Sequence, residues 1–157
     1  MKKNALVLFI LTVCTLGLFA AGPDYFAFEI GAGGAFDVDA GDIVSTNSMG
    51  FYYTFNETFA GGFSFTDIAG NDVSMVTISV SPLENLYVKM NTGQITSGAG
   101  VSALGFGAGF GYDFLTKKSG LFTSLGLYFD WYADNAGVYD IADGGVMAFG
   151  LKTRIGL

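Results

Sequence analysis

Large apolar side chains alternate with glycine, small or polar side chains along most of the chain, from Tyr25 to Leu157. A period of two residues places successive side chains on opposite faces of a β-strand. The alternation recurs in about eight runs, and segments rich in Gly, Ser, Asp or Asn separate most of them. The pattern therefore predicts an all-β protein of eight strands, each with one apolar face and one small or polar face.

The predicted apolar face is read from the alternating positions of each run. In the first half of the chain these positions are Phe26, Phe28, Ile30, Ala32, Phe36 and Val38, then Met49, Phe51, Tyr53 and Phe55, then Phe59, Phe63 and Phe65, then Val76, Ile78 and Val80, then Leu86, Val88 and Met90. In the second half they are Leu104, Phe106, Ala108, Phe110, Tyr112 and Phe114, then Leu121, Leu125, Leu127, Phe129 and Trp131, then Met147, Phe149, Leu151, Ile155 and Leu157. We expect longer connections over 39–47, 67–72, 93–100 and 133–144, alternating with short turns at 56–58, 82–85 and 116–120. This asymmetry is typical of outer-membrane barrels.

The size of the apolar face decides which way it points. It holds roughly thirty large residues, whereas the interior of an eight-stranded barrel is filled by only a few layers of side chains. A soluble lipocalin-like barrel with this face inside is therefore disfavoured. Charged residues make up only 13% of the chain and the mean hydropathy is +0.48, which is apolar for a soluble protein of this size. We predict an eight-stranded antiparallel up-and-down transmembrane β-barrel whose apolar face contacts outer-membrane lipids.

The N-terminus has the pattern of an export signal. Lys2 and Lys3 precede an apolar run that continues through Phe19, and small residues follow at 20–22. We expect a cleavable signal peptide over residues 1–22 and a barrel over 23–157, in the outer membrane of a diderm bacterium. An uncleaved anchor and a lipoprotein attached at Cys14 are the alternatives, and the short run and the bulky residue before the cysteine disfavour them.

Charge and residue types exclude several function classes. Without Lys2 and Lys3, five basic residues remain against 14 acidic ones, so the formal charge is five minus 14, or −9, and nucleic acid is not expected as a partner. The chain has no histidine, and its one cysteine lies in the predicted signal, so we expect no enzyme activity and no catalytic residues. The glycines at 31, 33 and 34 resemble a dinucleotide fingerprint, but no helix follows.

We expect neither a cofactor nor a metal. Asp37, Asp39 and Asp42 lack the spacing and the terminal Glu of a calcium loop. Together with three further acids they predict a solvated acidic outer surface that could meet an extracellular ligand; these are Asp134, Asp140 and Asp143.

The last strand carries a resemblance to a known family. Alternating apolar residues run to the final position of the chain, namely Phe149, Leu151, Ile155 and Leu157. With the eight-strand pattern, this ending resembles the small outer-membrane barrels of the OmpX, OmpA transmembrane-domain and OmpW type. In that family such an ending is the signal read by the barrel-assembly machinery. The final residue is Leu where the family favours an aromatic, and Lys152 stands where the family favours glycine.

The inward face offers the candidate site. Closure of the barrel would place Glu29 beside Lys152 and Arg154, and we expect Lys89 to pair with Asp113 on the adjacent strand. Asp130, farther along its strand, has no evident partner. Paired charges are tolerable in a buried environment. They serve either to fix strand register or to form a gated polar constriction.

Four inward glycines lie in a line on the sixth predicted strand, at 105, 107, 109 and 111. They either keep a lumen open or make room for bulky neighbours such as Tyr52, Phe122 and Tyr128, and packing is favoured in so narrow a barrel. The leading hypothesis is a monomeric, non-enzymatic barrel with a largely filled lumen and a surface, structural or adhesion role. The alternative, implied by the OmpW resemblance, is a narrow channel for small or apolar solutes.

Overall fold

The computed structural model describes residues 26–37, 41–55, 58–116, 124–135 and 137–156. The predicted signal peptide with Cys14, and the terminal Leu157, lie outside these residues. Among the residues described, no helix is both long and apolar enough to cross a membrane.

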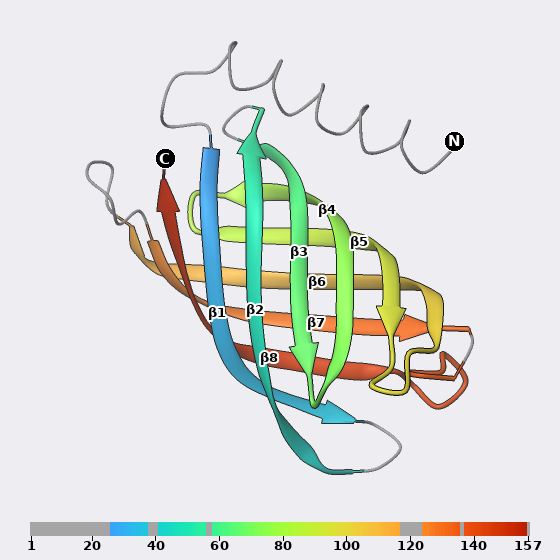
Figure 1. Ribbon diagram of the computed structural model, residues 1–157. Coiled ribbons are helices and arrows are strands. Elements are labelled where there is room, and N and C mark those ends of the chain that lie inside the picture. The colour runs from blue at the N-terminus through green and yellow to red at the C-terminus, as the bar shows by residue number, and fades with distance from the viewer. Residues whose placement is uncertain (1–25, 38–40, 56–57, 117–123, 136, 157) are drawn as a thin grey trace, which may run out of the picture.

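Eight antiparallel strands form one closed barrel in which β1 pairs with both β2 and β8 (Figure 1). The strands are β1 (Phe26–Asp37), β2 (Ile43–Thr54), β3 (Phe59–Ile68), β4 (Asn71–Leu83), β5 (Leu86–Thr96), β6 (Ser102–Thr116), β7 (Ser124–Asp134) and β8 (Val146–Gly156). Each strand is adjacent to the next one in sequence, so the topology is up-and-down. We call the end where β1 begins and β8 ends the turn end, and the opposite end the loop end. The predicted fold class is confirmed in its strand number, direction and closure.

The strands are strongly tilted. Following the paired residues from Phe26 once around the barrel leads through Tyr53 and the strands that follow to Met147, which pairs with Phe36. The path returns to β1 ten residues farther along, at 36 instead of 26. A stagger of this size requires steep strands in an eight-stranded barrel. In Figure 1 the near wall, β1–β4, accordingly crosses the far wall, β5–β8, at a large angle.

The two faces of the barrel differ as the alternation predicts. On β5, Tyr87, Lys89 and Asn91 are buried inside, while Val88 and Met90 are exposed outside. The same alternation holds along the middle of the other strands.

The strands reach farther toward the loop end than predicted. β2 begins at Ile43, inside the expected connection 39–47. The expected connection 67–72 is a two-residue turn, Ala69–Gly70, and both residues have positive φ, as in the type I′ turns that suit hairpins. These strand ends looked like loops because they are polar on their outward positions, where the middle of each strand is apolar.

A layer of apolar side chains fills the barrel near the loop end. Its large aliphatic members Ile68, Val73, Ile95 and Val146 are completely buried. Tyr139, from the β7–β8 connection, packs against this layer and donates a hydrogen bond to the Ile68 carbonyl (3.2 Å). The lumen is therefore apolar toward the loop end and polar toward the turn end.

Candidate functional site in the barrel lumen

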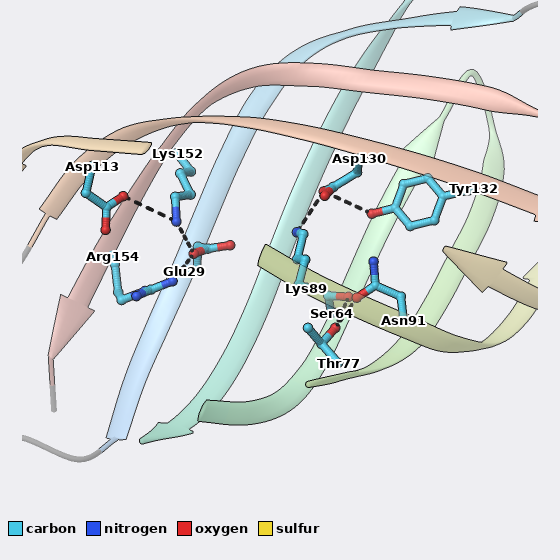
Figure 2. Close-up of polar contacts among 10 residues, drawn as sticks. All are labelled: Glu29, Ser64, Thr77, Lys89, Asn91, Asp113, Asp130, Tyr132, Lys152 and Arg154. Atoms are coloured by element: carbon cyan, nitrogen blue, oxygen red, sulfur yellow. Dashed lines mark hydrogen bonds and ion pairs between the residues drawn. The ribbon is translucent and has the colours of Figure 1, made fainter. Parts of the chain in front are cut away.

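Two groups of charged side chains lie inside the barrel, and Figure 2 shows them on either side of a short gap. In the group nearer the turn end, a Glu29 carboxylate oxygen accepts hydrogen bonds from Lys152 Nζ (3.1 Å) and Arg154 Nη2 (2.9 Å). Glu29 stands directly opposite Arg154 in the β1–β8 register, and Lys152 is one inward position away. The closure of the barrel thus brings together the three residues that the sequence placed side by side.

Asp113 and two tyrosines complete this group. Lys152 Nζ lies 3.4 Å from an Asp113 carboxylate oxygen and 3.7 Å from the centre of the Tyr87 ring. The Arg154 guanidinium lies 5.6 Å from the centre of the Tyr52 ring. Cations over aromatic faces gain electrostatic stabilisation, most of all when they are desolvated. Lys152 is 2% exposed, so Glu29, Asp113 and Tyr87 stabilise its charge in place of water.

The second group pairs Lys89 with Asp130, whose atoms Nζ and Oδ2 are 2.7 Å apart. Tyr132 donates a hydrogen bond to the same Asp130 oxygen (3.2 Å). The expected pairing of Lys89 with Asp113 is therefore wrong, and so is the expectation that Asp130 has no partner.

Glycines explain the actual pairing. In the register, Lys89 stands opposite Gly109 on β6, and Gly109 stands opposite Asp130 on β7. Because Gly109 has no side chain, the two charged side chains meet across the strand between them. A Cβ at this position would collide with Asp130 Oδ1 and lie 2.6 Å from the Phe129 carbonyl oxygen.

A glycine also lies between the charges of the ion pair that links β6 and β8 across β7. Asp113 on β6 stands opposite Gly126, and Gly126 stands opposite Lys152 on β8. A Cβ at Gly126 would collide with Asp113 Oδ1. In both ion pairs between strands two apart, the residue between the charges in the register is thus a glycine.

The line of inward glycines on β6 serves packing, as favoured from the sequence, with different neighbours. Gly111 faces the Tyr87 hydroxyl, Gly107 faces the Tyr132 ring, and Gly105 faces Ile95. Of the neighbours expected, Tyr52 and Tyr128 instead lie against glycines of β2 and β1, and Phe122 lies outside the described residues.

A buried chain of neutral polar groups continues from the charged residues toward β3. Thr77 donates a hydrogen bond to the Asn91 side-chain oxygen (2.8 Å), and its hydroxyl lies 3.2 Å from that of Ser64 (Figure 2). These neutral residues lie outside the candidate site predicted from the sequence, which consisted of inward charges alone. The alternation of Ser64, Thr66, Thr77 and Asn91 with apolar positions was the signal that would have found them.

The predicted acidic outer surface is only partly realised. Asp134 is completely buried, and its carboxylate accepts hydrogen bonds from the backbone amides of Val138 (3.4 Å) and Tyr139 (2.8 Å). It is therefore a structural residue of the β7–β8 connection and not part of a solvated surface. Asp42 and Asp143 are exposed, while Asp39 and the side chain of Asp37 are not described. No group of three metal-ligating side chains occurs among the described residues.

Three residues of the predicted assembly signal, Phe149, Leu151 and Ile155, lie on the outer face of β8. Leu151 is exposed and Phe149 stacks on Phe129 with ring centres 6.2 Å apart. Ile155 is half-buried, and Leu157 lies outside the described residues. Lys152, between these outward positions, points inward and carries the ion pairs with Glu29 and Asp113.

Comparisons with solved structures found several similar chains, among them de novo designed barrels. The chain is similar to a de novo designed transmembrane β-barrel, with 14% identity, a TM-score of 0.49, and coverage of 85% of this chain and 98% of that one. It is also similar to the de novo designed protein TMB2.3, solved by solution NMR, with 15% identity, a TM-score of 0.47, and coverage of 85% of this chain and 95% of that one. No family model and no curated protein matches. The resemblance to the OmpX, OmpA and OmpW type stays a prediction.

Proposed function

We propose that the chain is an integral outer-membrane barrel with a closed lumen and a non-enzymatic, structural or surface role. The observation that carries the proposal is that the barrel has apolar side chains on its outer face and charged side chains inside, the reverse of a soluble protein. Exposed large apolar side chains number 24 among the described residues, and most lie on the outer face of the strands. Soluble monomers rarely expose contiguous apolar surface of this extent. Lys89, Asp130, Lys152 and Glu29, by contrast, are buried inside.

A change of polarity on the outer wall supports a membrane boundary near the loop end. Along β5, the outward positions Val88 and Met90 are followed by Thr92, Gln94 and Thr96. Outward positions near the loop end of β2–β4 are polar as well, apart from Ile43 at the start of β2; these polar positions are Ser45, Asn47, Asp67, Asp72 and Ser74. Apolar bands bounded by polar strand ends are a property of transmembrane barrels.

The contents of the lumen support a closed barrel over a channel. The layer around Ile68, Val73 and Ile95 is 0–1% exposed, and Tyr139 lies against it. The charged residues toward the turn end pair with one another instead of lining an open path. Any solute passing through would have to displace both the apolar layer and the ion pairs.

Location, assembly and the absence of catalysis belong to the proposal. The export signal predicted over residues 1–22 and the apolar ending of β8 favour delivery to the outer membrane and insertion by the barrel-assembly machinery. The lack of histidine in the chain favours a non-enzymatic role. The barrel closes on itself, so we propose a monomer. An extracellular ligand would meet the exposed acids Asp42 and Asp143.

Refolding into lipid vesicles tests the barrel. We expect a folded form that migrates faster in unheated gels than in boiled ones and resists protease when vesicles are present. A chain that stays in the aqueous phase, with no heat-dependent shift, would contradict the proposal.

Conductance in planar bilayers tests the closed lumen. The wild-type barrel should be silent, as should a control with Asp143→Asn in an exposed connection. Steady openings of the wild type whose size changes in Lys152→Ala or Glu29→Ala would instead support the narrow channel.

A further inference from the structure

A groove of about 590 Å³ crosses the outer wall of the barrel over β1–β4. Its volume lies within the range of roughly 300–1,000 Å³ that is typical of small-ligand sites. Most of its lining consists of outward side chains, so it opens to the surroundings of the barrel and not to the lumen.

The groove is amphipathic, and the register shows how. Ile30, Met49 and Phe65 stand in one row across β1, β2 and β3. The next outward row toward the loop end holds Asn47 and then two acidic residues, Asp67 and Asp72. One end of the groove is thus apolar and the other is polar and anionic, at the level where the outer wall changes from apolar to polar.

The two acids at the polar end face each other directly. Asp67 on β3 is paired with Asp72 on β4, and both side chains are exposed. Like charges directly opposite each other in a sheet are destabilising. The Gly70 amide donates a hydrogen bond to Asp67 Oδ1 (3.3 Å), but the described basic side chains, Lys89, Lys152 and Arg154, all point into the lumen. The outer wall described here offers this pair no balancing cation.

We propose that the groove binds a membrane lipid with a primary ammonium headgroup. An acyl chain would lie over Ile30, Met49 and Phe65, and the ammonium group would donate hydrogen bonds to Asp67 and Asp72. This inference rests on the membrane placement proposed above, since only then does the apolar end of the groove face lipid.

The choice of headgroup follows from charge and shape. A primary ammonium is a compact cation with three hydrogen-bond donors, which suits two adjacent carboxylates. A phosphoglycerol headgroup carries a negative charge without a compensating cation, so the acid pair would repel it. A divalent cation held between the acids is the competing occupant, and the experiment below distinguishes it from the ammonium headgroup.

Native mass spectrometry of the intact barrel tests the site. The refolded protein would be released from micelles holding equal amounts of phosphatidylethanolamine and phosphatidylglycerol, with a chelator present. We expect about a tenfold preference for phosphatidylethanolamine, the ratio that one charge-assisted hydrogen bond gives. Asp67→Asn/Asp72→Asn should abolish the preference. Asp42→Asn/Asp143→Asn removes the same charge from exposed positions outside the groove and should retain it.

Three results would overturn the inference: equal retention of both lipids, a preference that survives Asp67→Asn/Asp72→Asn, or selective retention of phosphatidylglycerol when Mg²⁺ replaces the chelator. The folding assay keeps this failure apart from that of the proposed function. A barrel that inserts into vesicles without a lipid preference refutes only the lipid site, whereas a chain that does not insert refutes the membrane placement as well.

Discussion

The ion pair between Lys89 and Asp130 offers a direct measure of how the lumen is held together. The two side chains are each about 5% exposed, and their charged atoms are 2.7 Å apart. We consider the single changes Lys89→Met and Asp130→Asn and the double variant that combines them. Each single change leaves one buried charge without its partner, while the double variant removes both charges.

The magnitudes follow from the geometry. At 2.7 Å and an effective dielectric constant near 20, the Coulomb attraction is about 6 kcal/mol, but desolvation costs several kcal/mol for each ion. The net value of the intact pair is therefore small. Losing one partner should lower the free energy of unfolding by about 3–5 kcal/mol. The loss for Lys89→Met should lie at the lower end of this range, because Tyr132 still donates a hydrogen bond to Asp130. The double variant should lower the free energy of unfolding by about 2 kcal/mol or less.

Urea unfolding of the barrel in vesicles gives these values, with Trp131 as the fluorescent reporter. It is the single tryptophan, and its Nε1 donates a hydrogen bond to the Gly144 carbonyl (2.8 Å), so unfolding changes its surroundings. Asp143→Asn, an exposed change, should stay within about 0.5 kcal/mol of wild type. Single variants that each cost less than about 1 kcal/mol, with a double variant equal to their sum, would refute the buried pair.

Three further changes test other parts of the structure. Gly109→Ala should destabilise the barrel by about 1–3 kcal/mol, because its Cβ would occupy the space of the Asp130 carboxylate; an unchanged urea midpoint would contradict the pairing across glycine. Asp134→Ala should cost about 1–3 kcal/mol by leaving the amides of Val138 and Tyr139 without their acceptor, and chymotrypsin should cleave the β7–β8 connection faster than in wild type. Ala69→Asn should stabilise by up to about 1 kcal/mol, because Asn adopts the positive φ (54°) of this turn more readily than Ala; a lower urea midpoint would argue against the type I′ turn.

The strand pattern was readable from the sequence because it depends on a local property. A lipid-facing wall and a narrow interior demand opposite side chains at alternate positions, so the period of two persists along every strand. The alternation faded where the outward residues became polar, as at Asn47 and Gln94, and there the strand ends were mistaken for connections.

The ion pairs were only partly readable because they depend on register. Glu29 and Arg154 lie on strands that closure makes neighbours, so their proximity followed from the strand count alone. Lys89 and Asp130 are separated by a whole strand, and their contact depends on Gly109 standing between them. A shift of β6 by two residues would bring other side chains into that position, and no local pattern fixes such a shift.

The central claim is that the outer wall of the barrel faces lipid. Two single substitutions on the same face of β5, compared with each other, test it. Met90 is 73% exposed in the apolar part of the wall, and Gln94 lies on the same strand and face near the loop end. In vesicles, Met90→Arg should lower the free energy of unfolding by about 2–4 kcal/mol and Gln94→Arg by about 0–1 kcal/mol, the difference between the middle of a bilayer and its edge. Equal effects within about 0.5 kcal/mol, as expected for two exposed positions in water, would contradict a lipid-facing wall.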